Sequence, residues 1–474
     1  MAEGKIKRGF AAYLFILLMV FVAAFLIIIV VMIFSPFKNV LGFKYLSYNM
    51  SNNIVQTSSE QDIDFSTIDE LYVNCNNANV VIQRDNNIDT DTIRIENTCK
   101  GFARSSDNTS FDYNITLTGA SNDILNIDVH EPEGFLFFDK TVTISILIPA
   151  KSSYNFENTD VNISNTTGSI MIGNRNLLSE NNPEVKTSLD INTLSIKTNK
   201  GRIYFYKYLD GTFNNLFIKT SSSEVTSYVS DLSFTNKLSL YTDKGSFDFS
   251  SLKYTGAFTN NYNAEITLNN GDLAVQTLDG NVNLKMVSGY FDVANLNGSL
   301  CSNDMIEQMQ RATISIDKID GNVSLPFAND SRINIGELTS GSQIYVKGTS
   351  GSININGLNG KGFLEMSSGD INVTTYSDDL KVKTTSGDIN ISYQSPAIVN
   401  ETIFETNSGE INLQILGNLS FILRIYDTSG NYRDGRNIWF EYFGNSFSNP
   451  LIVNSGSKYL TIKSNSDISI SLIK

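Results

Sequence analysis

A short phrase recurs along the second half of the chain, and it constrains the fold more than any other feature. Each copy places a Ser-Gly pair before residues that alternate apolar with polar. The copies read GSININ, GDINVT, GDINIS and GEINLQ; they begin at Gly351, Gly369, Gly387 and Gly409 and lie 18, 18 and 22 residues apart. A second strand pattern, such as DDLKVKT, lies between consecutive copies. The chain therefore repeats a two-strand unit, which becomes stable only when neighbouring units stack on it.

The residues of this phrase indicate how each unit turns and packs. Glycine accepts the positive φ of a tight turn, and neighbouring Ser, Asn and Asp side chains hydrogen-bond to the backbone there. After the turn, Ile389 and Ile391 point to one face of the strand, while Asp388 and Asn390 point to the other. Stacked units bury the apolar row and satisfy the backbone groups together. We therefore predict an all-β chain whose bulk is a β-solenoid (β-helix) of roughly 18–22-residue coils.

The same periodicity extends upstream and sets the length of the array. Glycines follow one another at nine-residue intervals from Gly271 to Gly298. Between Gly168 and Gly409 there is room for about 12 coils, which at about 4.8 Å per coil make a rod on the order of 60 Å long. A β-sandwich or barrel with a strand every 8–12 residues shares this periodicity and stays an alternative. Only the solenoid tolerates the loss of one whole 18-residue unit.

An uncharged apolar segment lies near the N-terminus, at residues 11–34. As a helix it would rise about 36 Å, enough to cross the hydrocarbon core of a bilayer. A cleaved signal peptide is the alternative, but its apolar region is usually shorter. More basic residues precede the segment than follow it: Lys5, Lys7 and Arg8 before, Lys38 and Lys44 after. We predict an N-terminal transmembrane helix in the lipid bilayer, a cytoplasmic N-terminus and an extracellular remainder.

The chain then divides into successive regions around the repeat. Because a repeat array needs caps over its open ends, the less regular strand segments on either side are cap candidates. The expected regions are a cytoplasmic N-terminus (1–10), the transmembrane helix (11–34), a stalk (35–60), an N-terminal β region or cap (61–160), the solenoid repeats (161–416) and a C-terminal β cap (417–474).

Charge and composition exclude several classes of function. With 35 basic and 49 acidic residues the formal net charge is −14, which argues against nucleic-acid binding. A catalytic centre needs a positioned base, most often histidine, and the chain has one, His130. No second histidine or suitable cysteine can complete a zinc site around it. We therefore predict no catalytic residues, no cofactor and no metal, apart from one hypothesis for calcium.

Four acidic residues occupy equivalent places directly after turn glycines: Asp272, Asp370, Asp388 and Glu410. Stacked about 4.8 Å apart, such carboxylates could form a ladder that holds Ca²⁺. The full calcium-binding repeat signature, with paired glycines and regular aspartates, is missing. Carboxylates that cap turns explain the same pattern, and we favour that interpretation.

Cysteines and aromatic residues carry two further hypotheses. Cys75 and Cys99 flank adjacent strand segments and could form a disulfide outside the cell, whereas Cys301 is expected in the core. Near the C-terminus, Trp439 and Tyr442 belong to an aromatic cluster. Their rings could stack against a ligand, or they could fill the core of the C-terminal cap, the interpretation we favour.

The order of these features resembles that of a known family. An apolar N-terminal segment is followed by strands that end in TVTISILIPA (141–150), and then by reiterated SGDI-type turns. Over roughly residues 61–415 the chain resembles the bacterial putative-adhesin family, membrane-anchored β-strand-repeat proteins of unknown function. The resemblance implies a surface β-solenoid and brings no catalytic motif with it.

The sequence thus favours a non-enzymatic, membrane-anchored, adhesin-like surface module that binds a polysaccharide or a protein ligand. One alternative is an enzyme, a polysaccharide lyase or hydrolase on a β-helix with Asp and Glu as actors. Another is an envelope scaffold that self-associates through its ends. An enzyme needs charged residues gathered in a groove, and a scaffold needs uncapped ends.

Overall fold

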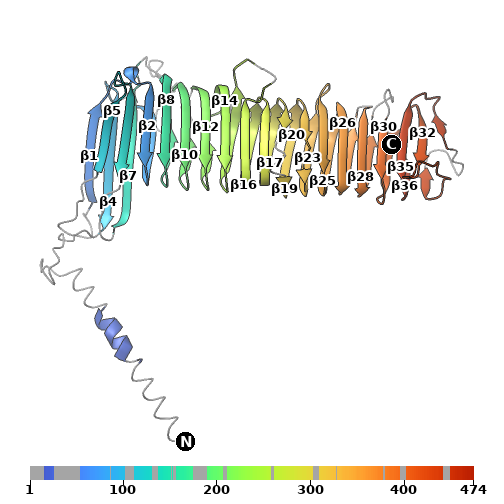
Figure 1. Cartoon of the computed structure of the whole chain (residues 1–474), viewed down its shortest axis with the longest axis horizontal. Helices are drawn as coiled ribbons and strands as arrows, with labels where there is room; N and C mark the ends of the chain where they lie inside the picture. The colour runs from blue at the N-terminus through green and yellow to red at the C-terminus, as the bar shows by residue number, and fades with distance from the viewer. Residues whose placement is uncertain are drawn as a thin grey trace, which may run out of the picture.

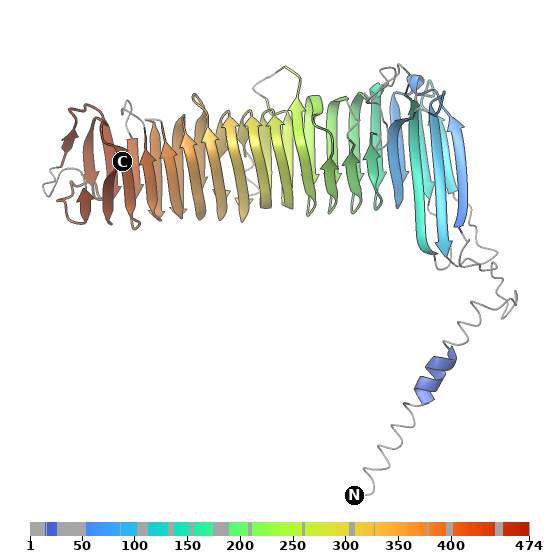
Figure 2. The same ribbon diagram turned by 180° about the vertical axis from the view of Figure 1, so that it is seen from behind.

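The protein folds as one elongated rod of stacked β-strands (Figure 1), and the view from behind shows the same succession (Figure 2). The strands lie across the long axis of the rod, with the first strands at one end and the last at the other. The computed structural model describes residues 15, 17–25, 54–85, 87–101, 112–130, 137–150, 152, 156–173, 189–206, 211–257, 261–302, 309–326, 328–376, 379–394, 402–440 and 449–473.

The predicted membrane-spanning segment lies largely outside the described residues. Of residues 11–34, the structure describes Phe15 and the stretch 17–25, which are helical. No helix within the described part of the chain combines the length and the apolar character that a bilayer span requires.

Buried and more exposed side chains alternate along the strands, as the sequence predicts. In β29 (Ile389–Tyr393) the side chains of Ile389, Ile391 and Tyr393 are buried, whereas Asn390 and Ser392 are half-buried on the other side. A strand with one apolar row can hide that row only against a second sheet. The inward rows of all coils accordingly merge into a single continuous core.

The coils present two main faces, called face A and face B. Face A consists, in spatial order from the N-terminal end, of β6 (Ile124–His130), β2 (Glu70–Cys75), β8 (Phe156–Asn165), β10 (Ile191–Thr198), β12 (Thr212–Thr220), β14 (Leu232–Thr242), β16 (Ala264–Asp279), β17 (Val282–Asn297), β18 (Leu300–Cys301), β21 (Val323–Leu325), β24 (Gln343–Gly348), β26 (Lys361–Ser368), β28 (Leu380–Ser386), β30 (Thr402–Thr406), β35 (Tyr459–Ser464) and β32 (Phe421–Tyr426). Neighbouring strands of this face are parallel.

Face B runs alongside in the same order. It consists of β7 (Phe137–Pro149), β3 (Ala78–Asp85), β9 (Ile170–Ile172), β11 (Arg202–Phe205), β13 (Glu224–Ser227), β15 (Ser246–Tyr254), the second parts of β16 and β17, β20 (Ala312–Asp320), β23 (Ser331–Leu338), β25 (Gly351–Leu358), β27 (Asp370–Thr375), β29, β31 (Ile411–Leu416), β36 (Ile468–Ile473) and β33 (Ile438–Phe440). These neighbours are also parallel. Besides these strands, the chain has a short turn η1 (Phe65–Thr67) and a separate two-stranded parallel sheet of β19 (Met309–Gln310) and β22 (Ala328–Asn329).

In-register stacking confirms the predicted β-solenoid. Equivalent isoleucines follow one another at the same position of successive coils, and each is fully buried: Ile353, Ile371, Ile389, Ile411 and Ile468. The first three are 18 residues apart, the spacing of the repeated phrase. Sandwiches and up-and-down barrels pair their consecutive strands antiparallel, so the parallel pairing within both faces rules that alternative out here.

Close backbone contact explains the four turn glycines better than positive φ does. Gly351 and Gly369 have positive φ, at 121° and 143°, whereas Gly387 and Gly409 do not. At all four, a Cβ atom would collide with the carbonyl oxygen of the residue stacked below, which is Ser331 for Gly351 and the preceding glycine for the others. The corner therefore requires glycine mainly because successive coils approach each other there.

The N-terminal end departs from simple succession. The coil formed by β2 and β3 lies between the coil of β6 and β7 and the coil of β8 and β9. Outside them the pairing turns antiparallel, because β5 runs against β6, β4 against β7, and β1 against β4. The added strands are β1 (Ile54–Asp62), β4 (Thr92–Gly101) and β5 (Asp112–Thr118). β1 begins inside the segment 35–60, so residues 54–60 of the expected stalk belong to a strand.

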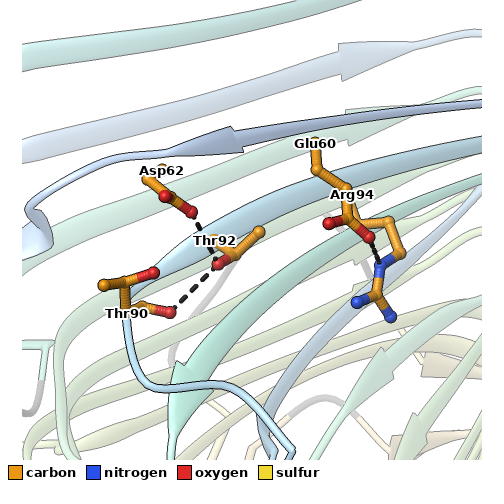
Figure 3. Close-up of polar contacts among 5 residues, drawn as sticks. All are labelled: Glu60, Asp62, Thr90, Thr92 and Arg94. Carbon is orange, nitrogen blue, oxygen red and sulfur yellow. Dashed lines mark hydrogen bonds and ion pairs between the residues drawn. The ribbon is translucent and has the colours of Figure 1, made fainter.

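Side-chain contacts join the outermost strand β1 to β4 (Figure 3). Arg94 Nε donates to a Glu60 carboxylate oxygen at 2.6 Å, across a directly opposed pair of residues. Next to it, the Thr92 hydroxyl lies 3.2 Å from Asp62 Oδ1 and 3.0 Å from the Thr90 carbonyl oxygen. The last strand of the N-terminal end is thus held by polar contacts as well as by its backbone.

The C-terminal end also departs from succession. The last coil in the chain, β35 with β36, inserts between the coil of β30 and β31 and the coil of β32 and β33. The outermost strand of face A is β34 (Leu451–Val453), which runs antiparallel to β32. After β31 the chain therefore skips one coil position and forms the tip with β32 and β33. It then returns with β35 and β36 to fill the skipped position.

Candidate binding surface

Three of the four acidic residues proposed from the sequence, the aspartates, cap turns. Asp370 Oδ1 accepts the backbone N–H of Asp388 at 2.9 Å, and Asp388 Oδ1 accepts that of Glu410 at 2.8 Å. Asp272 accepts the N–H of Tyr290 in the same way at 3.0 Å. Each carboxylate thus ties its coil to the next one. Among the described residues, no group of three or more His, Cys, Asp or Glu side chains is placed to hold a metal ion.

The cysteines do not form a reactive site in the described structure. Cys75 is a free and buried thiol, so the disulfide with Cys99 proposed from the sequence is not formed; the Cys99 side chain lies outside the described residues. Burial raises the pKa of Cys75 to about 12, which keeps the thiol protonated at neutral pH. Cys301 is also buried, although it does not belong to the hydrophobic core cluster.

Of the two aromatic residues proposed for ligand stacking, the structure describes Trp439. Trp439 lies on β33 with 54% of its surface exposed, which differs from the core position that we favoured. Tyr442 lies outside the described residues. His130, at the end of β6, is exposed.

Outward side chains on the C-terminal half of face A form straight rows, because equivalent positions stack in register. One row alternates in charge along five neighbouring strands: Lys347, Glu365, Lys383, Glu405 and Lys463. Ion pairs join Lys347 to Glu365 at 3.3 Å, and Glu405 to Lys383 and Lys463 at 3.1 and 3.8 Å. We call these five residues the charge row.

A second row, called the aromatic row, lies beside the charge row. It consists of Ser324, Tyr345, Phe363 and Lys381, on β21, β24, β26 and β28. The rings of Tyr345 and Phe363 stack nearly parallel, with centroids 5.2 Å apart and 11° between their planes. Each residue is 37% exposed. The two rings therefore stand face to face on the surface, a pair of large apolar groups in a polar setting.

A third row, called the polar row, flanks the aromatic row on the other side. It consists of Asn322, Gln343, Lys361 and Asp379. Asn322 Oδ1 accepts the backbone N–H of Gln343 at 2.8 Å, and Lys361 Nζ pairs with Asp379 at 3.2 Å. A hollow of about 430 Å³ is lined by the aromatic and polar rows together, with Val323, Ile344 and Gly362 between them. We call it the face A hollow.

Face B carries a different row, made of asparagines. The row consists of Asn334, Asn354, Asn372, Asn390 and Asn412, which stack in register. The side-chain amide of each of the last four donates a hydrogen bond to the Oδ1 of the asparagine before it, at 2.7 to 2.9 Å. A smaller hollow of about 270 Å³ lies along this row. Because these amides bond to one another, the row stabilises the stack and offers fewer free groups to a ligand. The face A hollow is the better candidate for binding.

The residues of the face A hollow were not singled out from the sequence, although a signal for them exists. Tyr345, Phe363 and Lys381 are separated by 18 residues, the period of the repeat. Once that period is known, residues 18 apart at outward positions belong to one surface row. The turn glycines reveal the 18-residue period. The surface rows are found only when that period is applied to every outward strand position.

Together, the stacked coils and the surface rows describe a parallel β-solenoid, and the face A hollow is the larger of the two hollows described above. The family described as Toastrack DUF4097 matches residues 68–341 and 271–471, and the chain belongs to this family. The resemblance to β-strand-repeat proteins of unknown function is thereby confirmed.

Solved structures give only distant likenesses. A putative cell adhesion protein from Clostridium sporogenes is 9% identical, with a TM-score of 0.21 over 59% of this chain and 98% of its own. A putative adhesin from Parabacteroides distasonis is 8% identical, with a TM-score of 0.19 over 89% and 98%. One from Parabacteroides merdae is 9% identical, with 0.17 over 88% and 96%. Likenesses this weak support no argument about function. No curated protein matches the chain.

Proposed function

We propose that the chain is a non-enzymatic, membrane-anchored surface module that binds its ligand on face A. The single observation that carries this proposal is the face A hollow, where a stacked aromatic pair lies between a polar row and a charge row. An exposed pair of rings on a rigid scaffold supplies contact area without further ordering of side chains. The regular coils hold these rows in fixed positions, as an adhesin-like binding surface requires.

The anchor is the second part of the proposal. Residues 11–34 are uncharged, and the described helical residues within them expose large apolar side chains, such as Phe21 at 72% and Phe25 at 64%. Apolar surface of this kind is stable in lipid and costly in water. We therefore place residues 11–34 in the bilayer and the β-rod outside the cell.

The acidic groups of face A favour binding over catalysis. A glycosidase or lyase needs a carboxyl group whose pKa differs from that of its partner, in a cleft around the scissile bond. Here Asp379 pairs with Lys361, and Glu405 pairs with Lys383 and Lys463. Each of these carboxylates is already engaged in an ion pair with lysine on an open strand face, an arrangement that suits a binding surface.

The test uses intact cells that express the full chain with a tag after Lys474. We expect the tag to be accessible to antibody and external protease, and the protein to stay in the membrane fraction after a carbonate wash. Cells with the chain should bind immobilised polysaccharide, and incubation with soluble polysaccharide should release no reducing ends or unsaturated uronates. A soluble protein would contradict the anchor, and steady product release would contradict the non-enzymatic assignment.

A further inference from the structure

The aromatic row has rings at two of its four positions, and next to Tyr345 it ends in a serine. Tyr345 is covered on one side by Phe363, but the residue in register on its other side is Ser324. A serine side chain is too short to cover an aromatic face. The space above Ser324 belongs to the face A hollow, so one face of the Tyr345 ring borders that hollow. A flat ligand ring placed there would continue the stack at the spacing of the strands.

The other end of the aromatic row carries a positive charge. Lys381 follows Phe363 in register and is exposed. Within the described residues no ion pair is formed by Lys381, whereas Lys361 in the adjacent row is neutralised by Asp379. The hollow therefore has a net positive lining, in a protein whose formal net charge is −14. An anionic ligand would find its complementary charge at this position, and repulsion over much of the remaining surface.

The backbone of this region offers nothing to an added peptide strand. β24 and β26 are interior strands, paired on both sides with β21 and β28 and with each other. Peptide recognition by strand addition needs an exposed edge with free N–H and C=O groups. The ligand must be recognised by side chains alone, through rings, amides and ammonium groups. The rows offer these over four strands, which at about 4.8 Å per strand span about 14 Å along the rod.

We propose that the face A hollow binds an acidic oligosaccharide laid along the rod, with one sugar ring against the free face of Tyr345 and a carboxylate at Lys381. The exposed amides of Asn322 and Gln343 line the hollow beside the rings and suit the hydroxyl groups of the sugars. This inference rests on the proposed function and deepens it, because it names the class of ligand that face A takes.

The test is calorimetric titration of the full chain in detergent with an oligomer of galacturonic acid, and with a galactose oligomer of the same length as the neutral comparison. We expect the acidic oligomer to bind and to bind more weakly as salt is raised. Tyr345→Ala and Phe363→Ala should each weaken binding by about tenfold. Lys381→Gln should weaken binding of the acidic oligomer down to the level of the neutral one.

Matched controls separate the hollow from the rest of the surface. Tyr290 is an exposed tyrosine of face B, and Lys318 is an exposed lysine outside the hollow, so Tyr290→Ala and Lys318→Gln should leave binding unchanged. Every variant should keep the melting temperature of the wild type within roughly 2 °C, because the substituted residues are on the surface.

Three results would overturn the inference. They are no binding of the acidic oligomer by the folded wild type, binding that Tyr345→Ala and Phe363→Ala leave intact, and equal binding of the neutral and acidic oligomers. The two proposals fail separately. If cells with the chain still bind polysaccharide while the hollow variants behave as wild type, the anchored surface module stands and the face A hollow is not its binding site. If cells with the chain bind no polysaccharide at all, the proposed function itself fails.

Discussion

Both ends of the rod close an open sheet edge, but the strands that close them differ. A stack of parallel strands leaves an open edge at each end, which invites pairing with another chain. At both ends a strand of reversed direction closes the stack: β1 on β4 at the N-terminal end, and β34 on β32 at the C-terminal end. At both ends, too, a coil from elsewhere in the chain inserts one position inward. The inserted coil ties each tip to the array through contacts between residues that are far apart in the sequence.

The two ends differ in the length of the strands that close them. β1 and β4 have nine and ten residues, and the sequence of β1, IVQTSSEQD, is mostly polar. β34 has three residues, and its central Ile452 is 62% exposed. Fewer hydrogen bonds and an apolar outer side chain make the C-terminal closure the weaker one. We expect that end to open first, and the following changes test this.

Deletion of residues 451–474 should have the largest effect. It removes β34 together with the inserted coil of β35 and β36, and so uncovers β30 and β31, whose Phe404 and Leu413 are buried in the native stack. Even if β32 moved one coil inward, no antiparallel strand would close the edge. We expect concentration-dependent oligomers in light scattering and a broad melt at lower temperature.

The matched change at the other end is deletion of residues 54–62, which removes β1 alone. It leaves β4 and β5 in place as antiparallel strands, so the protein should stay monomeric with a smaller loss of stability. Equal oligomerisation of the two deletions would show that the ends are equivalent, and would contradict the comparison.

Deletion of one interior unit, Gly369 to Ser386, should be milder than loss of the C-terminal end. It joins β26 directly to β29 and preserves the register of both faces, so a shorter folded rod should result. One defect is expected in the charge row, where Glu365 would lie beside Glu405 and cost up to about 1 kcal/mol. Circular dichroism and denaturant unfolding measure the outcome, and a chain without a cooperative transition would argue against independent stacking.

The sequence predicts the middle of this molecule better than its ends. The phrase at Gly351 to Gly409 carries both the spacing and the alternation, because each interior coil pairs with the coils next to it in sequence. At the C-terminus β30 pairs with β35 and not with β32, and the spacing of the repeat does not predict this pairing. Re-entry depends on which non-neighbouring strands fit together, which is a property of the tertiary fold.

The candidate site residues also differ in how well the sequence predicts them. Asp370 and Asp388 are recognisable from the repeat as part of a stacked row, but their partners, the N–H groups of the next coil, appear only in three dimensions. Tyr345 and Phe363 are one repeat apart, yet neither belongs to the repeated phrase. Turn residues stand out because their chemistry is restricted, whereas outward strand positions accept many residues and carry a weak signal.

Substitution of a corner glycine should have an intermediate effect. In Gly387→Ala the new Cβ would meet the carbonyl oxygen of Gly369, so the coils must separate at that corner. We expect a loss of about 1–3 kcal/mol in the free energy of unfolding. Gly417 lies where the chain leaves the array for the C-terminal tip, and a Cβ there would meet nothing within 4 Å. Gly417→Ala should therefore stay within about 0.5 kcal/mol of the wild type. Comparable losses for both would show that backbone freedom, and not coil contact, selects these glycines.

The smallest effect is expected from the polar contacts that hold β1. Arg94 pairs with Glu60 at 2.6 Å, but their side chains are 31% and 56% exposed, so water and salt screen the pair. Arg94→Ala should lower the free energy of unfolding by less than about 1 kcal/mol, and less still in high salt. Glu60→Gln keeps the size of the side chain and should cost no more than Arg94→Ala. If Arg94→Ala produced the oligomers expected of the C-terminal deletion, the N-terminal closure would depend on one ion pair and not on its longer strands, and the difference drawn between the two ends would be lost.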